Sequence, residues 1–76
     1  MIKLYGADWC GPCGQLKNAL KNKGIEYEYI NVDDHAEEVA LLGIRAIPVI
    51  VREDCERISG FPGIAESIDF IEGGLT

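Results

Sequence analysis

Apolar positions along this chain recur with two different spacings, and each spacing predicts one kind of element. Residues 25–32 alternate between apolar and polar side chains, which is typical of a half-buried β-strand. Shorter apolar runs bounded by glycine, proline or charged residues predict the other strands. The four expected strands are Lys3–Tyr5, Ile25–Val32, Pro48–Val51 and Cys55–Ser59.

Helical spacing begins after the first of these strands. Leu16 and Leu20 recur four residues apart within residues 12–23, which predicts an amphipathic helix. Pro12 suits the first turn of this helix, and Gly24 provides a stop at its C-terminus.

Two further helices are expected later in the chain. The segment His35–Leu42 follows Asp33 and Asp34, either of which can cap its first turn, and Gly43 ends it. Beyond a loop at residues 60–63, an isoleucine stripe marks one face of a final helix. The stripe consists of Ile64, Ile68 and Ile71.

The resulting order of elements is β-α-β-α-β-β-α. The first two strands are joined through a helix, so we expect them to be parallel with a right-handed crossover. The last two strands should form an antiparallel hairpin around residues 52–54. The sequence therefore predicts an α/β protein with a four-stranded mixed sheet flanked by helices, in a single domain over residues 1–76.

Composition and charge exclude several classes of protein. Apolar residues make up 47% of the chain, which suffices for one core and argues against disorder. The formal net charge of −6 disfavours direct binding to nucleic acid. No apolar stretch reaches the roughly 20 residues that span a bilayer, and the first residues lack the pattern of a signal peptide. We therefore expect a complete, monomeric protein of the cytoplasm.

The candidate chemistry lies in the sequence Trp-Cys-Gly-Pro-Cys at Trp9–Cys13. Two thiols separated by two residues can close and reopen a disulfide, so this spacing near a strand–helix–strand unit indicates thiol–disulfide exchange. Cys10 lies at the start of a helix, where free N–H groups and the helix dipole stabilise a thiolate, so it is the expected nucleophile. Cys13, one turn further in, is the expected resolving thiol.

A structural zinc half-site and a pair of inert buried cysteines are the alternatives at this motif. Zinc needs about four ligands, and the further candidates, Cys55 and His35, do not lie at finger-like spacing. We expect Cys55 to be a spare thiol. We expect no metal and no bound cofactor, because the exchanged electrons reside on the two sulfurs of the motif.

Three segments resemble known redox families. Trp9–Cys13 resembles the active-site signature of thioredoxins, and Gly43–Pro48 resembles the thioredoxin segment that carries a cis-proline. The chain length is similar to that of glutaredoxins. Ser59–Phe61, followed by a proline-containing turn, is similar to NrdH-redoxins, which are glutaredoxin-sized proteins with thioredoxin-like behaviour. The resemblance spans essentially the whole chain and implies the minimal thioredoxin-like fold and the reduction of protein disulfides.

The resemblance also implies a substrate-binding surface around the two cysteines. Its residues are Trp9, Gly11, Pro12, Ile47, Pro48 and Gly60. Pro48 would follow a cis peptide bond, the Ile47 backbone would hold an extended substrate segment, and Gly60 would border the same groove. Each has a structural alternative: Pro48 can open an edge strand, Trp9 can be a packing residue, and Gly60 can be a turn former.

Some positions depart from the patterns of both families. Thioredoxins carry a buried acid six residues before the first cysteine and a partner lysine in the next parallel strand. This chain has Leu4 at the first position and, nearest to the second, Tyr29. The docking site that glutaredoxins use for glutathione has no good match either, and Arg45 is the one plausible cation nearby.

The resemblance implies partners as well. An NADPH-dependent flavoprotein, thioredoxin reductase, would supply electrons, and disulfide-containing proteins such as ribonucleotide reductase would accept them. A glutathione-coupled glutaredoxin is the second hypothesis. The third is a metal-binding or scaffold module that uses the same fold without turnover, and it predicts that replacing either cysteine of the motif leaves function intact.

Overall fold

A computed structural model of the protein describes residues 1–73, and its seven elements follow the predicted order β-α-β-α-β-β-α. The elements are β1 (Ile2–Gly6), α1 (Gly11–Asn22), β2 (Tyr27–Asn31), α2 (Ala36–Leu41), β3 (Val49–Val51), β4 (Arg57–Ser59) and α3 (Ile64–Gly73). The thioredoxin-like fold predicted from the sequence is therefore confirmed.

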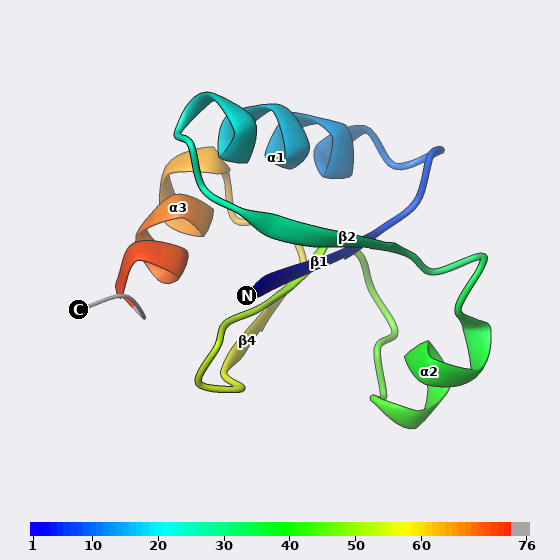
Figure 1. Ribbon diagram of the computed structural model, residues 1–76. Helices are drawn as coiled ribbons and strands as arrows, with labels where there is room; N and C mark the ends of the chain where they lie inside the picture. Colours follow the sequence, from blue (N-terminus) through cyan, green and yellow to red (C-terminus); the bar gives the residue numbers. More distant parts are fainter. Residues whose placement is uncertain (74–76) are drawn as a thin grey trace.

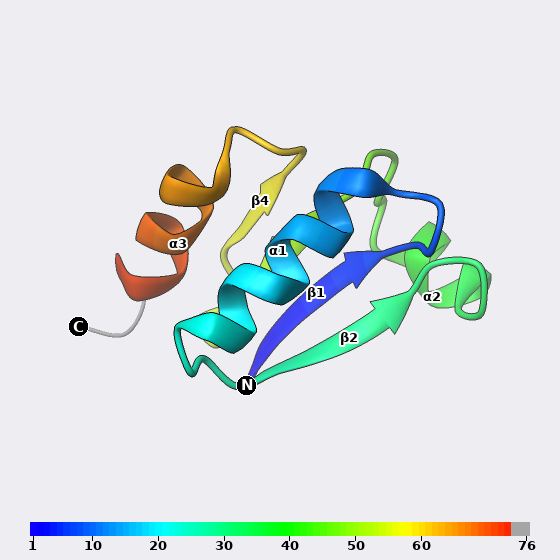
Figure 2. The same ribbon diagram turned by 90° about the horizontal axis from the view of Figure 1, so that it is seen from above.

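The four strands form one mixed sheet in the order β2-β1-β3-β4. β1 pairs with β2 in parallel and with β3 in antiparallel, and β3 pairs with β4 in antiparallel. Seen from above, the arrowheads of β1 and β2 point to the same end of the sheet, where α1 begins and α2 lies (Figure 2). We refer to this end of the sheet as the site end.

The helices divide between the two faces of the sheet: α1 and α3 lie over one face and α2 lies on the other (Figure 1). Side chains of β1 alternate between these faces, because successive residues of a strand point to opposite sides. The core under α1 and α3 consists of Ile2, Leu4, Leu16, Leu20, Ile50, Ile68 and Ile71. The isoleucine stripe of the last helix thus faces the core as the sequence predicts, with Ile68 and Ile71 buried.

The face that carries α2 has a smaller core. Tyr5, Ile30 and Val49 are buried there, and Val39 and Ile44 pack against them. α2 has six residues, none of them buried, so it covers only part of this face.

Two local predictions are wrong. The last strand does not begin at Cys55 but at Arg57, because Cys55 adopts a φ of +70° in a turn whose amide and carbonyl groups bond across it. Neither Asp33 nor Asp34 caps α2, since His35 is the N-cap residue and makes no side-chain capping bond. Instead, the carboxylate of Asp33 accepts a hydrogen bond from Trp9, which lies in the loop after β1.

None of the helices within residues 1–73 combines the length and the apolar character required to cross a membrane.

Candidate functional site

The site is organised by the first turn of α1. Cys10 is the N-cap residue, with an extended backbone (φ −95°, ψ 109°), and its Sγ accepts a hydrogen bond from the Cys13 amide at 3.3 Å. Pro12 lies in the first turn, where its missing N–H costs nothing. Cys10 and Cys13 form a disulfide, with their Cα atoms 5.3 Å apart.

The two sulfurs differ in their access to solvent. Cys13 is fully buried, whereas Cys10 is only partly buried and Gly11 beside it is exposed. A large thiol reagent or a disulfide of another protein therefore reaches Cys10 more readily than Cys13. This asymmetry is the arrangement that the sequence predicts for an attacking and a resolving sulfur.

Gly6 provides the space in which the buried sulfur lies. A β-carbon at Gly6 would lie 2.9 Å from the Sγ of Cys13 and 3.1 Å from the Cε1 of Tyr29. Contacts of this length require the neighbours to move, so the absence of a side chain at Gly6 allows Cys13 and the Tyr29 ring to pack over β1. Tyr29 is thereby a neighbour of Cys13.

Tyr29 lies in an environment that keeps its phenol protonated. Burial, followed by the negative charge of Asp8, raises the pKa of Tyr29 above its ordinary value, with smaller contributions from Tyr27 and Asp33. The ammonium group of Lys17 lies 4.1 Å from the centre of the Tyr29 ring. Leu4, at the position where thioredoxins carry an acid, is fully buried in the apolar core.

Trp9 lies on the surface beside Cys10. Its side chain is 70% exposed, and its Nε1–H donates a hydrogen bond of 3.0 Å to the Oδ2 of Asp33. Asp33 follows β2, and its own amide donates to the Oδ1 of Asn31. The bond therefore ties together the loops that leave the two parallel strands at the site end of the sheet.

Gly6 and Asp33 are residues of this site that sequence reasoning missed. The sequence offers Asp33 only as a helix cap, although its position after a strand parallel to β1 is a usable signal. The carboxyl ends of neighbouring parallel strands meet at one edge of the sheet, and the loops that follow them lie side by side.

Pro48 is brought to the same end of the sheet. The Ile47–Pro48 peptide bond is cis, and Pro48 is fully buried. Val49 pairs with Tyr5 in antiparallel, so continuing the register places Pro48 beside Gly6, which packs against Cys13. Ile47 is partly exposed.

Gly60 is joined to Pro48 by a hydrogen bond from its amide to the Pro48 carbonyl at 2.9 Å. Its φ of +84° favours glycine, whereas a β-carbon there would meet no atom within 4 Å. The positive φ alone explains why a glycine occupies this position, since no neighbouring atom excludes a side chain. This favours the interpretation of Gly60 as a turn former.

The remaining candidates are Arg45, His35 and Cys55. Arg45 is exposed, His35 shares a hydrogen bond with the Asn31 carbonyl, and Cys55 is a free, exposed thiol in the turn between β3 and β4. Within residues 1–73, no three His, Cys, Asp or Glu side chains are grouped so as to hold a metal ion.

Comparisons with known proteins agree with this geometry. The family model described as Glutaredoxin matches residues 2–57. A probable thioredoxin-2 from Caenorhabditis elegans is 39% identical over 86 aligned positions, which cover 99% of this chain but 59% of the worm protein. The chain thus spans about three fifths of the length of that relative.

Two solved structures extend the comparison. A mutant thioredoxin from Halobacterium salinarum superposes with a TM-score of 0.80 at 25% identity and covers 99% of this chain and 74% of its own. The glutaredoxin-like NrdH-redoxin from Escherichia coli superposes with a TM-score of 0.65 at 36% identity, over 79% of this chain and 82% of its own.

Proposed function

We propose, since this chain belongs to the glutaredoxin family and has the thioredoxin-like fold, that it is a dithiol–disulfide oxidoreductase that reduces disulfides of other proteins. The observation that carries the proposal is the Cys10–Cys13 disulfide at the start of α1, with one accessible and one buried sulfur. A structural disulfide within a four-residue segment would close too short a loop to restrain the fold much.

The reaction begins from the reduced form. The Cys10 thiolate, stabilised by the amide groups and the dipole at the start of α1, attacks one sulfur of the substrate disulfide and expels the other as a thiolate, which takes up a proton. Cys13 then loses its proton and attacks the Sγ of Cys10, which releases the second substrate thiol. The substrate gains two electrons and two protons, and the Cys10–Cys13 disulfide is left.

The substrate is held by the surface next to Cys10. Trp9 offers an exposed apolar ring held by Asp33, and the backbone of Ile47 beside the buried Pro48 offers hydrogen-bonding groups to an extended segment. Gly11 and Pro12, at the start of α1, border this surface, and Gly60 forms the turn whose amide is bonded to Pro48 beside it.

Electrons return to the protein from an NADPH-dependent thioredoxin reductase, and ribonucleotide reductase is among the acceptors. Support comes from the NrdH-redoxin of Escherichia coli, a glutaredoxin-like protein described by its thioredoxin-like activity profile. The match to the glutaredoxin family model favours a second candidate, a glutathione-coupled enzyme, for which Arg45 is the nearest cation in sequence to Ile47 and Pro48.

Coupled turnover of a disulfide substrate tests the proposal. One assay supplies NADPH and thioredoxin reductase, and the other supplies glutathione with its own reductase. We expect turnover in the first assay to exceed that in the second by at least tenfold. Turnover confined to the glutathione assay overturns the choice of reductant, and no turnover in either assay overturns the proposed function.

A further inference from the structure

The proposed resolving step requires a negative charge on a buried sulfur. The side chain of Cys13 is fully buried, and burial in apolar surroundings favours a neutral thiol over a thiolate. The neighbouring residues of β1 on this face are Gly6 and the buried Leu4, and neither carries a charge. The attacking species in thiol–disulfide exchange is nevertheless the thiolate. The step therefore depends on a group that stabilises a thiolate at Cys13.

The ring of Tyr29 lies next to this sulfur. Its Cε1 and the Sγ of Cys13 lie 3.1 Å and 2.9 Å from the point that a β-carbon of Gly6 would occupy, so these two atoms are no further apart than the sum of both distances. Tyr29 pairs with Leu4 in the parallel register of β1 and β2, and it packs against the core to which Leu4 belongs. The ring and the sulfur therefore lie on the same face of the sheet, beneath α1.

The Tyr29 ring holds a cation. The ammonium group of Lys17 lies 4.1 Å from the ring centre, within the range of a cation–π interaction. Lys17 follows Cys13 by four residues in α1, so their side chains are neighbours on one face of the helix. Lys17 is partly buried, whereas Lys21, the other lysine of α1, is exposed. Lys17 makes no ion pair within residues 1–73, so no carboxylate there is paired with its charge.

The other charged groups near the ring are acidic and exposed. They are Asp8 and Asp33, and the carboxylate of Asp33 accepts the hydrogen bond from Trp9. Burial, then Asp8, Tyr27 and Asp33 in that order, raises the pKa of Tyr29. A negative charge disfavours a nearby thiolate, whereas a positive charge favours it. Lys17 therefore acts in the direction that the resolving step requires.

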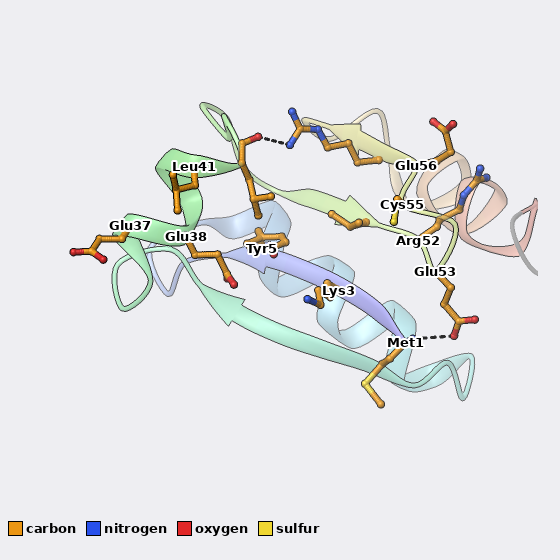
Figure 3. Close-up of a pocket in the computed structure, with 13 residues that line it drawn as sticks. Met1, Lys3, Tyr5, Glu37, Glu38, Leu41, Arg52, Glu53, Cys55 and Glu56 are labelled. Atoms are coloured by element: carbon orange, nitrogen blue, oxygen red, sulfur yellow. Dashed lines mark hydrogen bonds and ion pairs between the residues drawn. The ribbon is translucent and has the colours of Figure 1, made fainter.

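Charged groups of the neighbouring elements point elsewhere. The buried side chains of α3 are a serine and two isoleucines, and its acidic residues are exposed. Lys3 and Tyr5 of β1 face the groove on the other side of the sheet, where Figure 3 also shows Glu37 and Glu38 of α2. Arg45, in the loop before the buried cis-proline, is exposed.

We propose that Lys17 stabilises the Cys13 thiolate in the resolving step, and that Tyr29 is the positioning residue that holds Lys17. In this step the thiolate attacks the Sγ of Cys10, and the bond between that Sγ and the substrate sulfur breaks. The proton released by Cys13 passes through solvent to the expelled substrate thiolate, so no oxidant or reductant besides the substrate is needed. The inference rests on the proposed function, because it concerns the second step of that reaction.

Stopped-flow reaction of the reduced protein with dithiodipyridine, an uncharged aromatic disulfide, separates the two steps. Attack by Cys10 releases one thiopyridone chromophore at a rate proportional to the reagent concentration. Attack by Cys13 on the mixed disulfide releases the second at a rate that does not depend on this concentration. The measurement uses a Cys55→Ser background, because the exposed Cys55 thiol would also react. A pH series of the second rate reports the ionisation that precedes the attack.

Variants of the cation and of the ring locate the effect. Lys17→Met should slow the second phase about threefold or more at neutral pH and move its pH profile upward, while the first phase changes by less than about twofold. Lys17→Arg should retain the second rate, because a guanidinium also stacks on aromatic faces. Tyr29→Phe keeps the ring and should retain most of the rate, whereas Tyr29→Leu should lose as much as Lys17→Met.

Lys21→Met is the matched control, since it makes the same charge change at an exposed position of α1, and it should leave both phases unchanged. Equal second rates in Lys17→Met and Lys21→Met, or equal losses in Lys17→Arg and Lys17→Met, would overturn the inference alone. Equal losses in Tyr29→Phe and Tyr29→Leu would assign the effect to the phenol and overturn the role of Lys17.

Failure of the proposed function has a different signature. Absence of the second phase in the background protein, before any change at Lys17, would overturn the proposed exchange and this inference with it. Urea titrations establish that each variant is folded under the assay conditions. Should Tyr29→Leu be unfolded, the comparison of Lys17→Met, Lys17→Arg and Lys21→Met decides the inference.

Discussion

The start of α1 and the turn between β3 and β4 each place a cysteine in irregular backbone, yet the two thiols meet different surroundings. Cys10 has extended backbone angles, accepts a hydrogen bond from the Cys13 amide and has a sulfur partner. Cys55 has a φ of +70°, is exposed and is free. Its turn is closed by bonds between main-chain groups of Arg52, Cys55 and Glu56. The comparison teaches that a helix N-terminus and a second sulfur, rather than exposure, equip a thiol for exchange.

Replacing the cysteines one at a time should give the largest difference between the start of α1 and the turn between β3 and β4. Cys10→Ser should abolish disulfide turnover, because it removes the sulfur that we propose as the nucleophile. Cys13→Ser should accumulate a long-lived mixed disulfide between Cys10 and the substrate, which mass spectrometry detects.

Cys55→Ser is the matched control for these variants, and it should retain full turnover. Normal turnover of Cys10→Ser, or an absence of the adduct in Cys13→Ser, would show that the roles are assigned wrongly. Loss of turnover in Cys55→Ser would show that the turn between β3 and β4 takes part in the reaction.

Gly6→Ala should have the next largest effect, on the stability of the site end of the sheet. The new methyl group would lie within 3.1 Å of Cys13 and Tyr29, both packed against β1, so the free energy of unfolding should fall by about 1–3 kcal/mol in urea titrations.

Gly14→Ala provides the control for Gly6→Ala. Gly14 lies within α1 and its β-carbon would meet no atom within 4 Å, so alanine should stabilise the protein by roughly 0.5–1 kcal/mol. Equal stability of Gly6→Ala and the wild type would refute the tight packing of Cys13.

How well each feature of this molecule can be predicted from the sequence depends on how far apart in the chain the interacting residues lie. The start of α1 and the isoleucines of α3 depend on neighbours along the chain, and the structure confirms both predictions. The hydrogen bond from Trp9 to Asp33 joins residues 24 positions apart, and it depends on which strands are adjacent.

The packing of Cys13 and Tyr29 over Gly6 is harder still, because it involves three elements at once. The late start of β4 depends on the left-handed conformation of Cys55, a residue type for which sequence gives no reason to expect a positive φ. Register, burial and loop contact decide these features, whereas local spacing does not.

The stability of the protein at alkaline pH should depend on the site at the start of α1 rather than on the turn between β3 and β4. Because the folded state raises the pKa of Tyr29, the protonated phenol is favoured in the folded protein. The resulting stability is fully present below the unfolded pKa of about 10, and is lost as pH rises through the higher folded value.

Tyr29→Phe should therefore reduce the loss of unfolding free energy above that pH, although Tyr5, whose pKa is also raised, keeps part of the dependence. Urea titrations at a series of alkaline pH values measure this slope. An unchanged slope in Tyr29→Phe would argue that the phenol is not desolvated beside Cys13.

A substitution in the turn between β3 and β4 should have the smallest effect on stability, and this effect should appear at acidic pH. A hydrogen bond from Arg52 lowers the pKa of Asp54, with help from the Glu56 amide. A depressed pKa means that the stabilisation is present above the unfolded value and is lost as pH falls through the folded one. Asp54→Asn should thus slightly flatten the acid limb of the stability curve, while disulfide turnover at neutral pH stays unchanged. A matching loss of turnover would mean that the turn and the start of α1 are coupled, and that the two thiols differ less in their surroundings than their separate contacts indicate.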